Sequence, residues 1–369
     1  MKYEGIFAYF VFLLLCFTGC INEFIPKGVN EERGFFVVDG TITDGESVFT
    51  LSRSVGISEK LTGEETIDNA TVNVETNDGG SIPAQFRGGG KYVVQTGHLN
   101  PTLQYRLSIA VDGDEFLSEY LFPIVAAEID SLFPIKKVQN KPVFICVSTH
   151  ASANSSQYYR WTYHETWEVK AALYANARYG VTWDDIIFHS LATSENTYYC
   201  WGRDSSKSLI LGTTEKLSPN IISQQKVVEI PCDHDKLSIL YHIEVEQMQL
   251  REVAYRYFFD MQQKIESTGS LFSPILTTGV RGNIRCLSDP ERLIIGYIEV
   301  SIPTKKDLFI WEKEGFYEPH EQDCQSYSAE ARLPILLLGV STSLERCVDC
   351  RMRENASKNK PANWPTEHL

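Results

Sequence analysis

The stretch KLSILYHIEVEQM at residues 236–248 alternates apolar and polar side chains and indicates the fold class. Its apolar members fall on one face of an extended strand: Leu237, Ile239, Tyr241, Ile243 and Val245. Alternation of this kind is typical of a β-strand that buries one face. The segment therefore predicts a sheet with one side packed against a core.

A second periodic pattern of apolar residues begins directly after this strand, at residues 249–266. Apolar side chains recur there at three- and four-residue intervals: Leu250, Val253, Ala254, Tyr257, Phe258, Met261 and Ile265. That spacing places them on one face of an α-helix, and Gly269 is a typical residue for its end. We expect one long amphipathic helix whose aromatic stripe packs in the core and does not form a cofactor site.

Short strand-like runs separated by turn residues fill the chain from residue 34 to residue 125. The runs are FFVVDGTIT (35–43), SVFTLSRSV (47–55), ATVNVET (70–76), KYVVQTG (91–97) and QYRLSIAVDGDEFLSEY (104–120). Asp-Gly and Asn-Asp-Gly signals between them favour hairpins, because these residues tolerate positive φ. Strands about ten residues apart predict an immunoglobulin-like β-sandwich.

The prolines of LFPIVAAEIDSLFPI at 121–135 mark a boundary, so residues 126–369 are expected to form a second β-rich domain that carries the helix. Within it, QYYRWTYHETWEVKA at 157–171 again alternates, with aromatic residues on one face. Its aromatic residues and those near residue 200 could form a ligand platform, but alternation favours core packing. The predicted fold class is mainly β.

The N-terminus carries an apolar run at residues 6–17, directly followed by the sequence FTGC. A membrane-spanning helix needs roughly 20 apolar residues, whereas this run has the length of a signal-peptide core. FTGC resembles a bacterial lipobox, in which a small residue precedes a cysteine that is acylated. We predict a signal peptide at 1–19, lipid attachment at Cys20 and a polar tether at 20–33. The alternative is an ordinary signal peptide followed by a coincidental cysteine.

Composition and charge limit the classes of partner. Hydrophobic residues make up 43% of the 369 residues and aromatic residues 12%, which indicates a globular chain of about two domains. The formal net charge is −14. An acidic surface repels phosphates, so we exclude nucleic acid as a partner.

Nine cysteines are present, and seven lie beyond Cys20. In an exported chain they indicate up to three disulfides with one cysteine left over. Cys324 with the pair Cys347 and Cys350 forms one candidate framework. Cys200 with Cys286 is a candidate second pair, and the connectivity stays open at this point.

Four short fragments resemble parts of known chemical sites: HETWE, CDHD, RGGGK and CVDC. HETWE at 164–168 lacks the second histidine of a zinc-protease helix and lies on an alternating strand, so we interpret it as a solvated strand face. CDHD at 232–235 offers adjacent ligand types, which rarely converge on one metal, and is expected to be a polar turn. RGGGK at 87–91 precedes a strand and not a helix, unlike a phosphate-binding loop.

The fragment CVDC at 347–350 has three interpretations. With His320 and Cys324 it could form a four-ligand zinc site, and a C-x-x-C pair could be a redox centre. Export favours structural disulfides instead. We therefore predict no catalytic residue, no metal and no cofactor, and we expect that the chain is not an enzyme. An enzyme built on zinc or thiol chemistry at these cysteines is the alternative.

Several segments, in order, are similar to the exported Bacteroidota lipoproteins grouped as domain of unknown function 4249. They are FFVVDGTITDG and FTLSRSV near the N-terminus, then QYYRW (157–161), YYCWGRDSSKSLILGTT (198–214), SILYHIEVEQMQLREVAYRYFFDMQQKIESTGSLF (238–272), GNIRCLSDPERLIIGYIEVS (282–301) and CVDC. The resemblance implies a lipid-bearing cysteine matching Cys20, an N-terminal β-sandwich and a C-terminal β-rich domain.

The same resemblance implies a location and a role. The chain is expected at the outer membrane, held by its N-terminal lipid, with the periplasmic and cell-surface faces both open. It implies an accessory or binding role beside a TonB-dependent receptor in nutrient or siderophore import. A structural envelope component or adhesin that binds no small ligand is the alternative.

Overall fold

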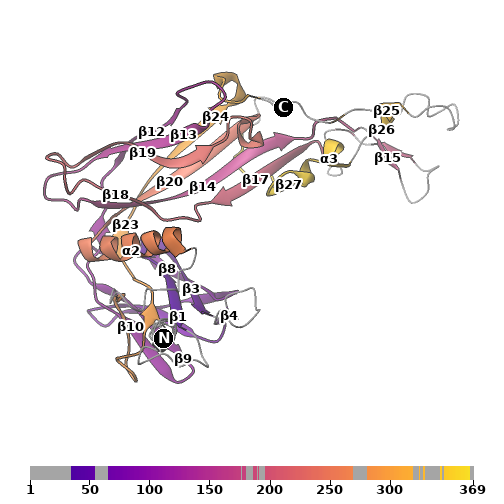
Figure 1. Ribbon diagram of the computed structural model, residues 1–369. Helices are drawn as coiled ribbons and strands as arrows, with labels where there is room; N and C mark the ends of the chain where they lie inside the picture. Colours follow the sequence, from indigo (N-terminus) through magenta and orange to yellow (C-terminus); the bar gives the residue numbers. More distant parts are fainter. Residues whose placement is uncertain are drawn as a thin grey trace, which may run out of the picture.

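The computed structural model describes residues 35–54, 65–175, 177–179, 186–188, 190, 196–268, 281–318, 324, 327–328, 341–342 and 345–365. The expected signal peptide, Cys20 and the tether lie outside the described residues. The described chain is mainly β and contains several sheets, which confirms the expected class. The sheets gather into two bodies, with one helix lying between them (Figure 1).

The first body has two sheets around one core. One has the order β22-β1-β3-β8-β7 with β4 also on β3, and the other has the order β21-β10-β9-β5-β6. The bounds of the first are β1 (Phe36–Gly40), β3 (Gly45–Arg53), β4 (Glu65–Thr66), β7 (Gln85–Gly88), β8 (Lys91–Gly97) and β22 (Ile294–Ile295). Those of the second are β5 (Thr71–Thr76), β6 (Ser81–Pro83), β9 (Tyr105–Val111), β10 (Asp114–Ser118) and β21 (Ile284–Cys286).

Alternating side chains from both sheets fill this core, and the rings of Phe36 and Phe116 stack across it with centroids 4.3 Å apart. The expected turns form where the Asp-Gly and Gly-rich signals stand. Between β9 and β10, Asp112 and Gly113 have φ of 54° and 85°, as a tight hairpin requires. RGGGK is the β7–β8 turn, and a Cβ on Gly90 would lie 2.3 Å from the Leu51 carbonyl oxygen.

After the helix that follows the second body, the chain returns to the first body, and residues 284–302 add strands to its sheets. β21 pairs with β10, and β22 pairs in parallel with β1. A further three-stranded sheet has the order β11-β23-β2, with bounds β2 (Ile42–Thr43), β11 (Ile124–Val125) and β23 (Val300–Ile302). The expected domain at 126–369 therefore contributes three strands that pair with strands of the expected domain at 34–125.

The second body also has two sheets, of orders β12-β13-β19 and β24-β20-β14-β17-β27, with β18 on β14. The bounds are β12 (Ile129–Ile135), β13 (Val143–His150), β14 (Tyr158–Lys170), β17 (Tyr199–Ser205), β18 (Ile210–Thr213), β19 (Ile221–Ile230), β20 (Leu240–Leu250), β24 (Thr304–Trp311) and β27 (Ala356–Ser357). Two further short antiparallel pairs are β15 (Ala177–Tyr179) with β16 (Ile186–Phe188), and β25 (Tyr327–Ser328) with β26 (Ser341–Thr342).

The strand at 236–248 lies at the centre of this body as β20. Tyr241, Ile243 and Val245 are fully buried in the shared core, as their alternation predicts. The strand begins later than expected, because Leu237 belongs to the 3₁₀ helix η1 (Asp235–Leu237). A second 3₁₀ helix, η3 (Glu312–Glu314), follows β24.

The helix α2 (Glu252–Thr268) follows β20 and lies between the two bodies (Figure 1). Its buried residues join a small cluster with Tyr158 and Tyr297: Ala254, Tyr255, Tyr257 and Phe258. The hydroxyl of Tyr257 accepts a hydrogen bond from the Gly296 amide at 2.8 Å. Val253 is 66% exposed, because it lies at the margin of the helical stripe and not at its centre. Among the described residues, no helix is long and apolar enough to cross a membrane.

The end of the described chain, residues 345–365, runs along the second body, and we call it the C-terminal strap. It contains α3 (Glu345–Val348), η5 (Cys350–Met352) and β27, which pairs with β17 (Figure 1). The indole N–H of Trp364 donates a 2.7 Å hydrogen bond to a carboxylate oxygen of the fully buried Glu168. The strap is therefore an integral part of the sheet that contains β14 and β17.

Candidate functional site

A pocket of about 400 Å³ lies in the second body, between the turn after β19 and the C-terminal strap. Its lining comes from three separate parts of the chain. They are the strand β14, the turn at 231–235 and the strap, and the lining residues are Trp167, Pro231, Asp233, His234, Asp235, Met352, Arg353 and Glu354.

The first wall is the CDHD fragment. His234 caps η1, with its ring Nδ1 accepting a hydrogen bond from the Lys236 amide at 3.1 Å. The fragment is the polar turn that its sequence predicts. Its position beside a pocket was not predicted, since the opposite wall comes from a distant segment.

The second wall is the strap immediately after η5. The Arg353 Nη1 atom lies 3.3 Å from an Asp235 carboxylate oxygen. A second contact between the turn and the strap joins the His234 Nε2 atom to a Glu354 carboxylate oxygen, 3.4 Å away. These two contacts hold the strap against the turn, so the pocket exists only while the strap is in place.

The floor is Trp167, of which only 1% is exposed. The Lys236 ammonium lies 4.6 Å from its ring centroid and forms an ion pair with Glu165. Glu165 is 3% exposed and also accepts a 2.8 Å hydrogen bond from the Tyr241 hydroxyl. Burial, followed by the charge of Glu165, raises the pKa of Tyr241 well above its ordinary value.

The HETWE fragment is not the solvated face that we expected. His164 is exposed, but Glu165 and Glu168 are buried at 3% and 0% exposure. Glu165 stands at an odd position of β14, on the same face as Trp161 and Trp167. That single carboxylate on an apolar face was the signal in the sequence for a buried, partnered charge.

Carboxylates dominate the electrostatics of the pocket. Its lining carries three carboxylates (Asp233, Asp235 and Glu354) and one guanidinium (Arg353), and these four groups together have a net charge of −2. Beside it, burial raises the pKa of Tyr317. Asp235, Glu312 and Asp233 raise it further, against an opposing effect of Arg353. The phenol therefore experiences a negative potential.

Two disulfides secure the strap. Cys324 bonds to Cys347, which confirms that part of the expected framework. Cys350 bonds to Cys200 on β17, so CVDC forms two structural disulfides with distant partners. The candidate pairing of Cys200 with Cys286 is wrong, because Cys286 lies on β21 in the first body. Cys286, Cys146 and Cys232 are buried free thiols.

The aromatic residues that could have formed a platform are mostly core. Tyr159 and Trp161 are fully buried, and Tyr158 and Trp201 are 8% and 6% exposed. The neighbouring Tyr198 and Tyr199 are half-buried. Core packing, the expectation from strand alternation, is confirmed for the first four.

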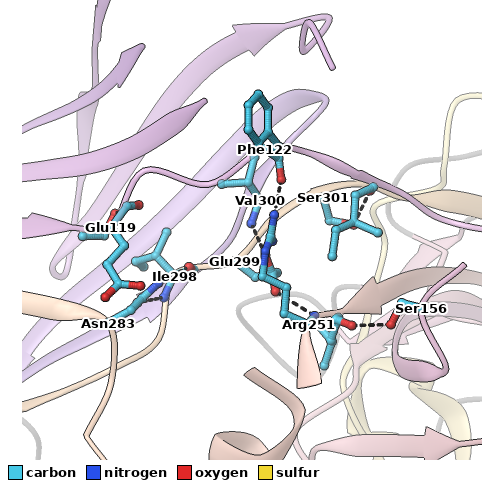
Figure 2. A network of polar contacts seen from close by, with 12 residues as sticks. Glu119, Phe122, Ser156, Arg251, Asn283, Ile298, Glu299, Val300 and Ser301 are labelled. Atoms are coloured by element: carbon cyan, nitrogen blue, oxygen red, sulfur yellow. Dashed lines mark hydrogen bonds and ion pairs between the residues drawn. The ribbon is translucent and has the colours of Figure 1, made fainter. Parts of the chain in front are cut away.

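A buried ion pair joins the two bodies where β20 meets α2 (Figure 2). Glu299, with 1% of its side chain exposed, pairs with the Arg251 guanidinium and accepts hydrogen bonds from the amides of Arg251 at 3.1 Å and Val300 at 2.9 Å. The same guanidinium donates to the Phe122 carbonyl. Arg251 thus contacts the chain at Phe122, where it first leaves the first body, and at Glu299, just before it leaves that body again through β23.

Comparison with known proteins identifies a family but no characterised relative. No curated protein matches the chain. The family described as "Domain of unknown function (DUF4249)" matches residues 21–307, well over half of the chain. The match includes the turn wall of the pocket and Trp167, whereas the strap wall at 352–354 lies beyond it. The chain therefore belongs to the DUF4249 family.

Proposed function

We propose that this protein is a lipid-anchored accessory protein of the bacterial outer membrane, which captures a small ligand for a TonB-dependent receptor in nutrient or siderophore import. The proposal of a lipid anchor rests on the sequence FTGC, which directly follows an apolar run too short to span a bilayer. The pocket of the second body supports the capture.

The arrangement of the chain suits this role. A lipid at Cys20 and the tether at 20–33 would lead into β1, so the first body, which we propose is an immunoglobulin-like sandwich, would be the one joined to the membrane. The pocket lies in the other body, between the turn and the strap. In the proposed role, the folded first body would stand between the lipid and the ligand site, which would leave the site free to contact a receptor in the same membrane.

The anchor is tested with a Cys20→Ala variant, followed by membrane fractionation and labelling with palmitate. We expect the variant to leave the membrane fraction and to incorporate no label. Cys16→Ala is the matched control, because the same change inside the discarded segment should alter neither result. Anchoring at Cys20 is refuted if Cys20→Ala remains in the membrane while the wild-type protein takes up no palmitate.

The receptor partnership needs a separate experiment. The tagged wild-type protein is extracted from membranes in a mild detergent and its co-purifying proteins are identified, with the Cys20→Ala protein as the control for binding in the wrong compartment. We expect a TonB-dependent receptor only with the wild type. Its absence from both samples would remove the import role.

A further inference from the structure

We infer that the pocket between the turn at 231–235 and the C-terminal strap binds a small organic cation that carries an amine or guanidinium group. This inference rests on the proposed capture role and names its ligand class. It distinguishes that role from a structural envelope component or adhesin, which would bind no small ligand.

The charge of the lining favours a cation. Asp233, Asp235 and Glu354 bring three carboxylates, from both walls, against the single guanidinium of Arg353. That guanidinium already lies 3.3 Å from Asp235. An anionic ligand would have to compete with Asp235 for Arg353 and approach two other carboxylates, whereas a cation gains from the same field.

The apolar surface favours an organic cation over an inorganic one. Trp167 forms the floor, and Met352, which is 53% exposed, lies on the strap wall. The exposed side chain of Met352 suits the methylene stem of an alkylamine or guanidine, whereas Trp167 is 1% exposed and already has the Lys236 ammonium against its ring. Among the described residues, no three His, Cys, Asp or Glu side chains are placed to hold a metal ion.

The volume limits the size of the ligand. About 400 Å³ is at the small end of the range for ligand pockets, roughly 300 to 1,000 Å³. It suits one compound of the size of an amino acid or a short polyamine.

The test uses the full mature lipoprotein in a non-ionic detergent, with L-arginine amide as the probe in isothermal titration calorimetry. L-glutamate and glucose are the anionic and neutral comparison compounds. The pocket variant is Asp233→Asn/Glu354→Gln. Its matched control is Asp289→Asn/Glu291→Gln, which makes the same two changes at exposed positions of the first body.

We expect arginine amide to bind the wild type and the control variant equally, and to bind the pocket variant about five- to tenfold more weakly. Higher salt should weaken binding to the wild type, since the attraction is partly screened. The inference is overturned if arginine amide does not bind. It is equally overturned if both double variants weaken alike, or if glutamate or glucose binds as tightly.

The two proposals fail separately. Retention of Cys20→Ala in the membrane together with no palmitate uptake by the wild type, or the absence of a receptor from both samples, would refute the proposed function, and cation binding by the purified protein would stand. Conversely, a correctly anchored protein that co-purifies with a receptor but binds no arginine amide would refute this inference alone.

Discussion

Arg251 joins the two bodies through its ion pair with the buried Glu299. We expect Arg251→Met to lower the free energy of unfolding by about 3 kcal/mol, because it leaves the Glu299 carboxylate buried without its counter-charge. Urea denaturation measures the change. The control is Arg285→Met, whose exposed pair with Glu119 spans 3.5 Å and should contribute less than about 1 kcal/mol. Equal losses in the two variants would contradict this account.

Glu299 also predicts a pH dependence. Burial raises its pKa above the ordinary 4.5, although Arg251 and the amides of Arg251 and Val300 oppose the shift. A raised pKa means that the folded state binds more protons than the unfolded one, so this residue's contribution to stability falls as pH rises from about 4.5 through the raised value. Glu299→Gln should remove that slope from a series of unfolding experiments at stepped pH. An unchanged slope would contradict it.

Sequence reasoning at this scale located buried apolar residues far better than buried charges. The alternation of β20 placed Tyr241 and Ile243 in the core, and both are fully buried. Glu165 and Glu299 are buried as well, each with a cation from a distant segment. The period of a strand reports which face a residue occupies, but it says nothing of a partner on another element.

The disulfide from β17 to the strap is the element that keeps the pocket complete. Cys200→Ser/Cys350→Ser should lower the free energy of unfolding by about 2 to 5 kcal/mol, since the bond closes a loop with a sequence separation of 150. Cys324→Ser/Cys347→Ser, across a separation of 23, should cost less. Limited proteolysis should cleave near residues 352–354 in the first variant before it cleaves the wild type.

Counting thiols checks the pairing on which this prediction depends. The denatured, unreduced protein with an acylated Cys20 should show three thiols, from Cys146, Cys232 and Cys286. Cys286→Ala should show two and keep both disulfides. Loss of a disulfide in Cys286→Ala would restore the pairing of Cys200 with Cys286 that the structure contradicts.

The strap shows why the site itself could not be predicted. CDHD was recognisable as a turn and CVDC as disulfide-forming, because each property is local. Their meeting required knowing that Cys350 bonds to Cys200 and that Trp364 reaches Glu168, at separations of 150 and 196 residues. A pocket formed by segments so far apart in the sequence has no local sequence motif by which it could be recognised.

At the scale of the whole molecule, the first body depends on residues far along the chain. A fragment of residues 35–125 lacks the partners that cover β1 and β10, namely β22 and β21. We expect it to show no cooperative unfolding by circular dichroism, and we expect a peptide of residues 281–303 to restore a transition. A peptide of the same composition in scrambled order is the control, and a cooperative transition in the fragment alone would contradict this prediction.

The turn signals predicted the hairpins of this body, because an Asp-Gly turn is specified by its own residues. The returning strands escaped prediction for the opposite reason. Residues 284–302 read as strands from their composition, but nothing local shows that they pair with strands more than 150 residues earlier. A boundary drawn at one point along the chain cannot represent a body that the chain leaves and re-enters.

The parallel pairings of this return have a mechanical consequence. β1 lies beside β22 and β2 beside β23, and the chain runs from β23 directly into β24 of the second body. A pull between a lipid at Cys20 and a partner on the second body would draw the start of β1 one way and the end of β23 the other. Such a force shears the paired strands, so their hydrogen bonds share the load and must break together. A tethered protein built in this way withstands tension that would peel a hairpin apart.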